Sequence, residues 1–361
     1  MTIYFVLYAL IISFSIFIRR GEPIGNITEK TKKSETFAML ILVCFVIALR
    51  HPSMGWDLGY GRGNGYLDWF HVIGSHSWER IIHSGGYLNY EWGYIVFNKL
   101  ISYISTEYQC LLIMSAVASL MPLAFMISKY SNDRLFSVIV YLGLPSFLII
   151  YSGLRQGIAI GITCFSYIYI EQKKPFKFIL TVILASLFHS SAIIFLIAYP
   201  VFRIKLDKQK RILSLFAIPI VYIFRIPLFS IFSKIFKDNA SLEINDSKTL
   251  LLVFVAIYIF CTVFINENDK IASGFLNIFY LAIICMCFSG VYLTAMRVGY
   301  YFMIGLVIAL PNIICDINDA NSYLICKLSI SGIFIIYGLY SLYSSSWPMA
   351  YPYDFFWSNI L

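Results

Sequence analysis

The chain has 361 residues, of which 60% are hydrophobic and only 13% are charged. A soluble domain carries about 25% charged residues, so this composition excludes an ordinary soluble enzyme, a disordered chain and a nucleic-acid-binding module. The formal net charge is +8, from 27 Lys and Arg against 19 Asp and Glu. In a membrane protein such an excess is typical of basic cytoplasmic loops.

Apolar runs recur along the whole chain at lengths near the ~20 residues with which a helix crosses the bilayer. The sequence therefore predicts one all-helical, polytopic transmembrane domain over residues 1–361, with about ten spans. A large outer loop is expected at 51–91, between the second and third membrane segments, and an aromatic outer tail at 344–361. The expected spans are 3–18, 36–50, 109–128, 135–151, 157–170, 212–231, 249–265, 271–290, 298–315 and 322–343.

Two further apolar segments have an open interpretation. Residues 92–105 are short and contain Asn98 and Lys99, which favours an interfacial helix or a half-helix. Residues 178–202 are long enough to span, but His189-Ser190-Ser191 interrupts them at the centre. A re-entrant hairpin or a broken helix is expected there, since irregular backbone is tolerated at membrane depth where protein or a cavity surrounds it.

Basic residues gather in 19–33, 129–134, 171–177 and 203–211. If neither ambiguous segment crosses the membrane, the positive-inside rule assigns all four groups to the cytoplasm and both termini to the outside. If both segments cross, 129–134 and 171–177 move outside. The first topology satisfies the rule better.

The first candidate for chemistry is the outer segment that contains Asp57. Five glycines occur in the eleven residues 55–65, GWDLGYGRGNG. Such a loop can fold closely around a ligand. A flexible outer loop is the alternative.

Arg155 is the second candidate, because an ionisable side chain at membrane depth needs a partner or a cavity. Gly153, Gly157 and Gly161 form a small-residue seam that lets a neighbouring helix approach closely. Arg155 lies about 200° around the helix from Gly153 and Gly157 and so points away from that seam. A guanidinium binds phosphate through two parallel hydrogen bonds. The alternative is an Arg that extends its head group to the interface.

His189 and Arg297 are the remaining ionisable candidates. A neutral His189, beside two serines, could hydrogen-bond a phosphate or a sugar hydroxyl. Arg297 precedes Tyr300 and Tyr301 by three and four residues, so one of these rings shares its helix face. Structural roles for both, in packing or at an aromatic interface, remain open. The aromatic tail from Trp347 to Trp357 suits either an interfacial belt or a stiff lid for sugar stacking.

The sequence has no Walker A, GxSxG, HExxH or DxD motif, and its eight cysteines form no CxxC pair. We therefore expect no metal site, no cofactor and no ATP-driven transport.

Six segments occur in the order of a known family. GWDLGYGRGNGYLDWF resembles the outer-loop motif of the EpsG/Wzy polymerases, which build bacterial surface polysaccharides, and LNYEWGYIVFNKLI resembles the segment after it. SGLRQGIAIGI, FHSSAIIFL, MRVGYYF and YPYDFF resemble the later motifs of that family. In the first motif Tyr66 lies nine residues after Asp57, a wider spacing than the family's usual one.

The resemblance implies an enzyme at the periplasmic face of the bacterial inner membrane, in O-antigen or capsule synthesis. Such a polymerase transfers a growing glycan from an undecaprenyl diphosphate carrier to the sugar end of a new lipid-linked unit. Arg155 and Arg297 would hold the diphosphate, and Asp57 or His189 would accept the proton of the attacking hydroxyl. Accessory or sugar contacts are implied for Tyr66, Gln156, Tyr300 and Tyr353.

The implied partners are the lipid-linked oligosaccharide as donor and acceptor, membrane lipid and a chain-length regulator protein, with no nucleic acid. Two alternatives stay open. A lipid-linked oligosaccharide flippase is a transporter with many spans, although related halves are not evident here. An O-antigen ligase shares the chemistry but passes the polymer to another acceptor.

Overall fold

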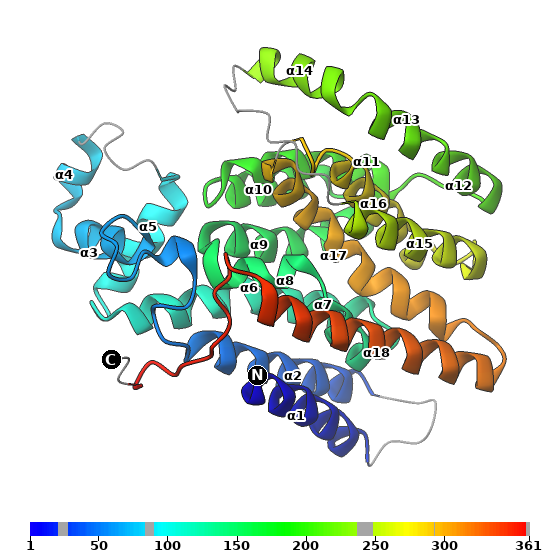
Figure 1. The fold of residues 1–361 in the computed structure, drawn as a ribbon, viewed down its shortest axis with the longest axis horizontal. Coiled ribbons are helices and arrows are strands. Elements are labelled where there is room, and N and C mark those ends of the chain that lie inside the picture. The colour runs from blue at the N-terminus through cyan, green and yellow to red at the C-terminus, as the bar shows by residue number, and fades with distance from the viewer. Residues whose placement is uncertain (21–27, 84–89, 237–247, 292, 359–361) are drawn as a thin grey trace. The chain divides into compact units, whose positions relative to one another are not determined.

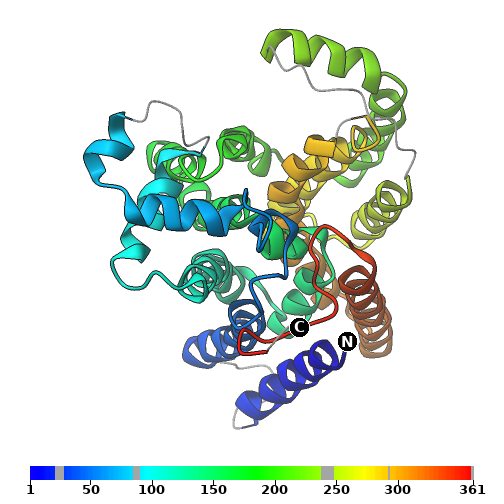
Figure 2. The same cartoon turned by 60° about the vertical axis from the view of Figure 1, so that its left-hand side comes forward.

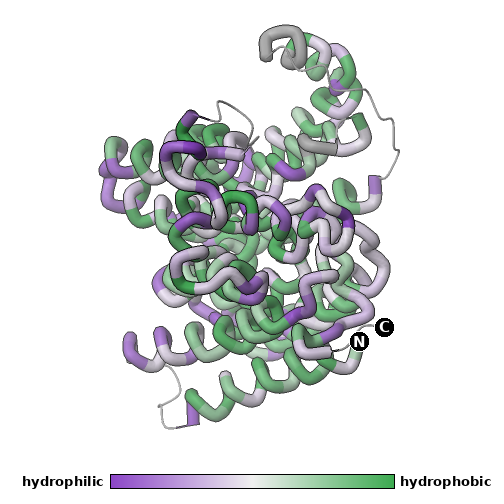
Figure 3. The backbone as a smooth tube through the Cα atoms, turned by 90° about the vertical axis from the view of Figure 1, so that its left-hand side faces the viewer, coloured by the Kyte–Doolittle hydropathy of each residue, from purple (hydrophilic) through white to green (hydrophobic). Residues whose placement is uncertain are grey.

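The computed structural model describes residues 1–20, 28–83, 90–236, 248–291 and 293–358. These residues are mainly helical and contain no strand, which confirms the predicted all-helical class (Figure 1). Hydrophobic residues line most of the helices, while hydrophilic residues gather near helix ends and connections (Figure 3). This pattern is the one expected of a membrane protein.

The chain forms two compact units. The first comprises Met1–Lys129, Arg134–Ile193 and Ser331–Leu361. In it, α1 packs on α2, and α9 packs on α10 (Figures 1 and 2). Its helices are α1 (Thr2–Arg19), α2 (Glu29–Ala48), η1 (Trp56–Leu58), α3 (Tyr66–Ser75), α4 (Trp78–His83), α5 (Trp92–Ser102), α6 (Tyr108–Tyr130), α7 (Arg134–Leu142), α8 (Pro145–Ser152), α9 (Leu154–Glu171) and α10 (Pro175–Ser186).

The second unit comprises Tyr130–Asp133 and Ile194–Ile330, and its core is the packed pair α16 and α17. The helix η2 (Ser190–Ile197) begins in the first unit, and α18 (Ala320–Ser344) begins in the second unit and ends in the first. The other helices of the second unit are α11 (Ala198–Phe202), α12 (Lys208–Leu215), α13 (Ala217–Ile223), α14 (Arg225–Phe236), α15 (Thr249–Phe264), α16 (Lys270–Met286) and α17 (Leu293–Cys315).

Local sequence explains where several helices begin. Thr28 precedes α2 and accepts a hydrogen bond from the N–H of Thr31 at 3.2 Å. Asp269 precedes α16 and accepts from the N–H groups of Ile271 and Ala272. Such side chains satisfy donors that lack a partner in the first helical turn. Pro145 and Pro175 occupy the first positions of α8 and α10, where proline's missing N–H costs nothing.

Four described helices are long and apolar enough to cross a membrane, and the number is six if two bent pairs each count as one span. The protein is therefore a helical membrane protein, but the expected ten spans are not confirmed. The four are α1, α6, the part Met296–Cys315 of α17, and α18.

The expected spans at 135–151 and 212–231 each contain a sharp bend. The first is α7 and α8, bent by 62°, and the second bends by 73° between Lys208–Ile223 and Arg225–Ile231. Proline explains both breaks, because it cannot donate to the preceding turn and its ring collides with that turn. Pro145 begins α8, and Pro227 lies in the first turn of α14.

The two ambiguous segments are both short or interrupted. The helix α5 has 11 residues, which is too few to cross ~30 Å of hydrocarbon. This length fits the expected interfacial helix or half-helix. The helix α10 ends at Ser186, and the chain continues as the 3-10 helix η2 from Ser190. The predicted interruption at His189-Ser190-Ser191 is confirmed.

Segment 51–91, expected as an outer loop, contains the helices η1, α3 and α4; its residues 84–89 lie outside the described part. The tail begins where expected, because α18 ends at Ser344.

Candidate functional site

An ion-pair cluster in the first unit joins three segments that are far apart in the sequence. The guanidinium Nη1 of Arg155 lies 2.5 Å from Oε2 of Glu91. The other carboxylate oxygen of Glu91 accepts a hydrogen bond from the backbone N–H of Ser190 at 2.8 Å and lies 3.5 Å from Nδ1 of His189. Glu91 thus connects Arg155 to His189, the two residues that the sequence singled out separately.

Two tyrosines complete the surroundings of the guanidinium. Arg155 donates from Nε to the hydroxyl of Tyr66 at 3.2 Å. Its Cζ lies 4.5 Å from the ring centre of Tyr90 and 5.6 Å from that of Tyr66, within the range of cation–π attraction. The side chains of Arg155 and Glu91 are 20% and 18% exposed. Water is therefore largely removed from the pair, which strengthens its electrostatic attraction.

The charge of Glu91 is held firmly. Burial by itself would raise the pKa of this carboxyl group, but the neighbouring His189, the hydrogen bond from the Ser190 N–H and the charge of Arg155 lower it to about 2. Glu91 is consequently ionised at any physiological pH. A pKa on the acidic side is typical of a carboxylate that accepts several hydrogen bonds beside a cation.

Close helix packing positions Arg155. Its helix α9 begins at Leu154, and the glycines of this helix face α6. A Cβ atom added at Gly161 would lie 2.7 Å from the carbonyl oxygen of Ser119, and one at Gly157 would lie 3.3 Å from the Ser119 hydroxyl. The predicted seam is confirmed at these two positions. Gly153 instead lies beside Ile149 in the preceding helix, because it is the N-cap of α9.

A backbone contact positions Glu91. Glu91 is the N-cap residue of α5, and the N–H groups of Gly93 and Tyr94 donate to the carbonyl oxygen of Leu187 at 2.8 and 3.3 Å. The end of α10 and the start of α5 therefore satisfy one another's unpaired backbone groups. A side chain at Gly93 would collide with Leu187, whose carbonyl oxygen would lie 2.7 Å from the added Cβ. This junction brings Glu91 to His189.

Asp57 lies in η1 and is bonded to the tail. Its Oδ1 accepts from the indole N–H of Trp347 at 3.0 Å. The backbone N–H of Trp56 donates to the Ser152 hydroxyl and to the Trp347 carbonyl oxygen, at 2.8 and 3.1 Å. The glycine-rich loop is thus fixed close to the beginning of α9.

Electrostatics links Asp57 to the cluster. The pKa of Tyr90 is raised, chiefly by burial and then by Tyr66 and the charge of Asp57, while Arg155 lowers it. The charges of Asp57 and Arg155 therefore both influence the pKa of Tyr90. The structure does not bring Asp57 into hydrogen-bonding contact with Arg155.

Tyr353 serves the fold of the tail. Its hydroxyl donates to the Val46 carbonyl oxygen at 2.8 Å, and its ring packs edge-on against Tyr4. Further along the tail, Phe355 forms an isolated antiparallel bridge with Arg50. Arg50 is fully buried, and its guanidinium donates to backbone carbonyl groups, including that of Tyr151 at 3.2 Å.

The other predicted residues belong to α9 or to the second unit. Gln156 is buried in α9. Arg297 and Tyr300 both lie on α17 in the second unit, Arg297 half-buried and Tyr300 buried. The described contacts therefore bring together Arg155, His189 and Tyr66 among the predicted residues.

Sequence reasoning missed Glu91 and Tyr90. The available signal was a single acidic residue directly before the apolar run WGYIVF, next to a tyrosine. Nothing local distinguishes this acid from an ordinary helix N-cap, since its partners are 64 and 99 positions away in the chain.

The EpsG family model matches residues 36–355, nearly the whole chain. The chain belongs to the EpsG family. The match includes every residue of the cluster, and it confirms the family that the motifs indicated. No curated protein and no solved structure matches the chain. Membership of the EpsG family points to a polysaccharide polymerase-type function at a membrane.

Proposed function

We propose that this EpsG-family protein polymerises lipid-linked oligosaccharide repeat units at the periplasmic face of the inner membrane, in O-antigen or capsule synthesis. It transfers the growing glycan from an undecaprenyl diphosphate carrier to a sugar hydroxyl of the next lipid-linked unit. The observation that carries the proposal is the cluster of Arg155, Glu91 and His189, beside tyrosine rings. It combines a cation for a diphosphate with a base for a hydroxyl.

Arg155 has the chemistry to stabilise the leaving group. The acceptor oxygen attacks the anomeric carbon of the donor, and the bond from that carbon to the carrier diphosphate breaks. Negative charge then accumulates on the diphosphate, where a fixed guanidinium lowers the barrier. Nη1 of Arg155 donates to Glu91 and Nε donates to Tyr66. The described residues provide no hydrogen-bond acceptor for Nη2. We assign Nη2 to a diphosphate oxygen.

His189 is the better-placed base of the two candidates. Glu91 lies on the Nδ1 side of its imidazole, at 3.5 Å, so the carboxylate favours the tautomer with the proton on Nδ1. Nε2 then accepts the proton of the attacking hydroxyl, as in other base–carboxylate arrangements. Hydrogen bonds of this kind are often long before substrate binds. Asp57, bonded to Trp347, would position the loop or the acceptor sugar. The diphosphate role of Arg297, a half-buried residue of α17 in the second unit, stays a prediction from the family resemblance.

The experiment is deletion of the gene, followed by complementation with wild type, Arg155→Lys or Arg155→Ala at matched membrane abundance. Deletion should leave single repeat units on the final acceptor. Lysine keeps a charge for Glu91 but cannot donate to Glu91, Tyr66 and a phosphate in one plane. We therefore expect Arg155→Lys to lose most of the polymer ladder, by about tenfold or more in polymerised product, and Arg155→Ala to lose nearly all.

The control is Arg203→Lys, since Arg203 is exposed in the second unit. A full-length ladder from Arg155→Lys would contradict the diphosphate role. Almost no glycan on the surface after deletion would indicate a flippase, and full-length polymer retained on the lipid carrier would indicate a ligase.

A further inference from the structure

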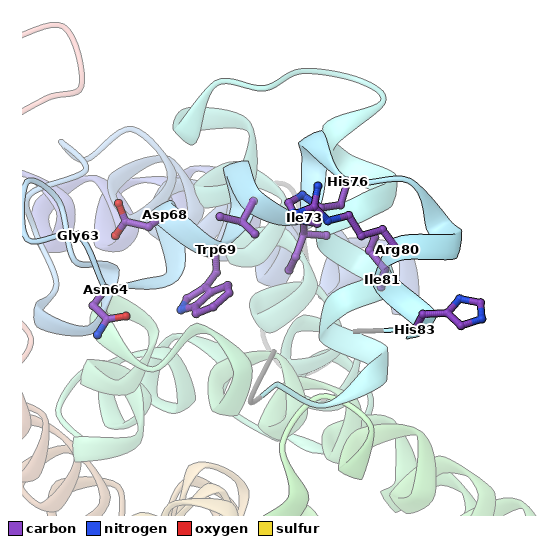
Figure 4. Close-up of a pocket in the computed structure, with 10 residues that line it drawn as sticks. Gly63, Asn64, Asp68, Trp69, Ile73, His76, Arg80, Ile81 and His83 are labelled. Carbon is purple, nitrogen blue, oxygen red and sulfur yellow. The ribbon is translucent and has the colours of Figure 1, made fainter. Parts of the chain in front are cut away.

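A pocket of about 850 Å³ lies on the outer segment of the first unit, between α3 and α4. Asn64 and Asp68 line one end, Trp69 lies in the middle, and Ile73, His76 and Arg80 line the other end (Figure 4). None of these residues belongs to the cluster, and neither α3 nor α4 is among the candidate spans. The volume is typical of a site for a ligand of drug-like size, such as a short saccharide.

The pocket is built before any ligand arrives. Lys99 is buried in α5, and its ammonium group donates to the carbonyl oxygens of Gly74 and His76, both at 2.8 Å. These bonds satisfy two backbone carbonyl oxygens at the end of α3 and fix the turn that leads to α4. Asp68 caps the other end of α3, where it accepts from the Gly65 N–H at 2.9 Å. Both ends of the helix that carries Trp69 are thus held in place.

The lining has the chemistry of a saccharide site. An indole packs against the C–H face of a sugar ring, while amide, carboxylate and guanidinium groups bind hydroxyls. Asn64 and Arg80 are exposed. Within the described residues, neither side chain forms a hydrogen bond. Their polar heads are therefore available to a ligand.

The pocket adjoins the ion-pair cluster through two rings. The centre of the Trp69 ring lies 6.0 Å from that of Tyr90, edge to face. Tyr90 in turn lies against Arg155, with 4.5 Å between its ring centre and Cζ. A sugar on Trp69 would therefore be close to a diphosphate on Arg155.

We propose that this pocket binds the terminal sugars of the acceptor unit, the end that carries the attacking hydroxyl. The inference rests on the proposed function, because it takes Arg155 as the diphosphate ligand. The acceptor's attacking end must meet the donor's anomeric carbon, which is bonded to that diphosphate. The acceptor's own lipid is at its opposite end, so a pocket outside the candidate spans suits these sugars.

The test measures binding of a lipid-free probe to the purified full-length protein in detergent. The probe is the oligosaccharide repeat unit released from the surface polysaccharide of the parent strain, and calorimetry gives its affinity. Trp69→Ala should weaken binding by about tenfold or more. Trp78→Ala is the matched control, because Trp78 belongs to α4 but does not line the pocket. Arg80→Ala, a change at an exposed residue, should also weaken binding without disturbing the fold.

Arg155→Lys separates this inference from the proposed function. The probe carries no diphosphate, so we expect this variant to bind it as wild type does while failing to polymerise. Wild-type affinity in both Trp69→Ala and Arg80→Ala, or no binding of the probe to the wild-type protein, would overturn the pocket assignment and leave the polymerase proposal standing. Normal polymer in the deletion strain, with Trp69-dependent binding, would instead overturn the polymerase proposal and leave a saccharide site.

Discussion

Among single residues, Glu91 is the one that contacts both other ionisable groups of the cluster, Arg155 and His189. It accepts from Arg155 and from the Ser190 N–H, and it faces the imidazole of His189. Removing one partner of a largely buried ion pair leaves the other charge poorly solvated, which is more costly than the pair is favourable. Glu91 therefore affects both the stability of the first unit and the orientation of two proposed functional groups.

We predict that Glu91→Gln lowers the free energy of unfolding by about 3 kcal/mol at pH 7. The folded-state pKa is about 2, against an ordinary value of 4.5. The stabilisation is thus complete above the unfolded pKa and is lost as the pH falls from 4.5 towards 2. Melting temperatures of the purified protein, measured across this range, should converge for wild type and variant at the acidic end.

Glu107→Gln is the control, because Glu107 is exposed and lies outside the cluster. A pH-independent difference between wild type and Glu91→Gln would show that the ion pair does not stabilise the fold.

The sequence identified those site residues that are unusual in their local setting. Arg155 and His189 are ionisable residues within apolar runs, which is sufficient reason to select them. Tyr66 was selected through the motif resemblance, and its hydroxyl accepts a hydrogen bond from Nε of Arg155. Glu91 was not selected, because the contact of Gly93 with Leu187 that brings it to His189 depends on tertiary packing.

Among the elements, the contact between α9 and α6 determines where Arg155 lies. The backbones approach so closely at Gly161 that a Cβ would be 2.7 and 2.8 Å from the carbonyl oxygens of Ser119 and Ala118. Such small-residue contacts are a common basis of helix association in membranes.

We predict that Gly161→Ala destabilises the protein by about 1–3 kcal/mol, because the methyl group would force the two backbones apart. Gly332 in α18 provides the matched control, since a Cβ there would meet no atom within 4 Å. Gly332→Ala should be neutral or stabilising by up to about 1 kcal/mol, as alanine is the better helix former. Melting temperatures in one detergent measure both, and equal stability of Gly161→Ala and wild type would contradict the tight contact.

Helix content was predictable from the apolar runs, while helix continuity was less so. The bends at Pro145 and near Pro227 follow from proline chemistry, but hydropathy averages across a bend and registers one run. The short helices α3 and α4 were not anticipated in 51–91, because the glycine-rich beginning of that segment hides the order that follows it.

At the scale of the whole molecule, α9 and α10 connect the cluster to a basic loop. Arg155 lies at the start of α9, and His189 follows the end of α10. Between the two helices lie Lys173 and Lys174. The cluster and this loop are therefore at opposite ends of the packed pair, and a cytoplasmic loop would direct the cluster to the periplasmic side.

The lengths of these elements favour a re-entrant segment at 178–202. The helix α10 has 12 residues and is about 18 Å long, less than the ~30 Å of the hydrocarbon core. The following apolar helix, Ser190–Phe202, is also in the short class of 10–17 residues. Basic groups lie before the first arm and after the second, at 171–177 and 203–211.

We therefore predict that reporter fusions after Lys174 and after Lys210 both report the cytoplasm. The two short arms would enter and leave on one side, with His189 at the tip. Fusions after Lys33 serve as the cytoplasmic reference, and fusions at Gly65 and Ser345 should report the periplasm. If Lys174 and Lys210 were found on opposite sides, residues 178–202 would cross the membrane, which would contradict the re-entrant segment. One of the two basic groups, 171–177 or 203–211, would then lie outside.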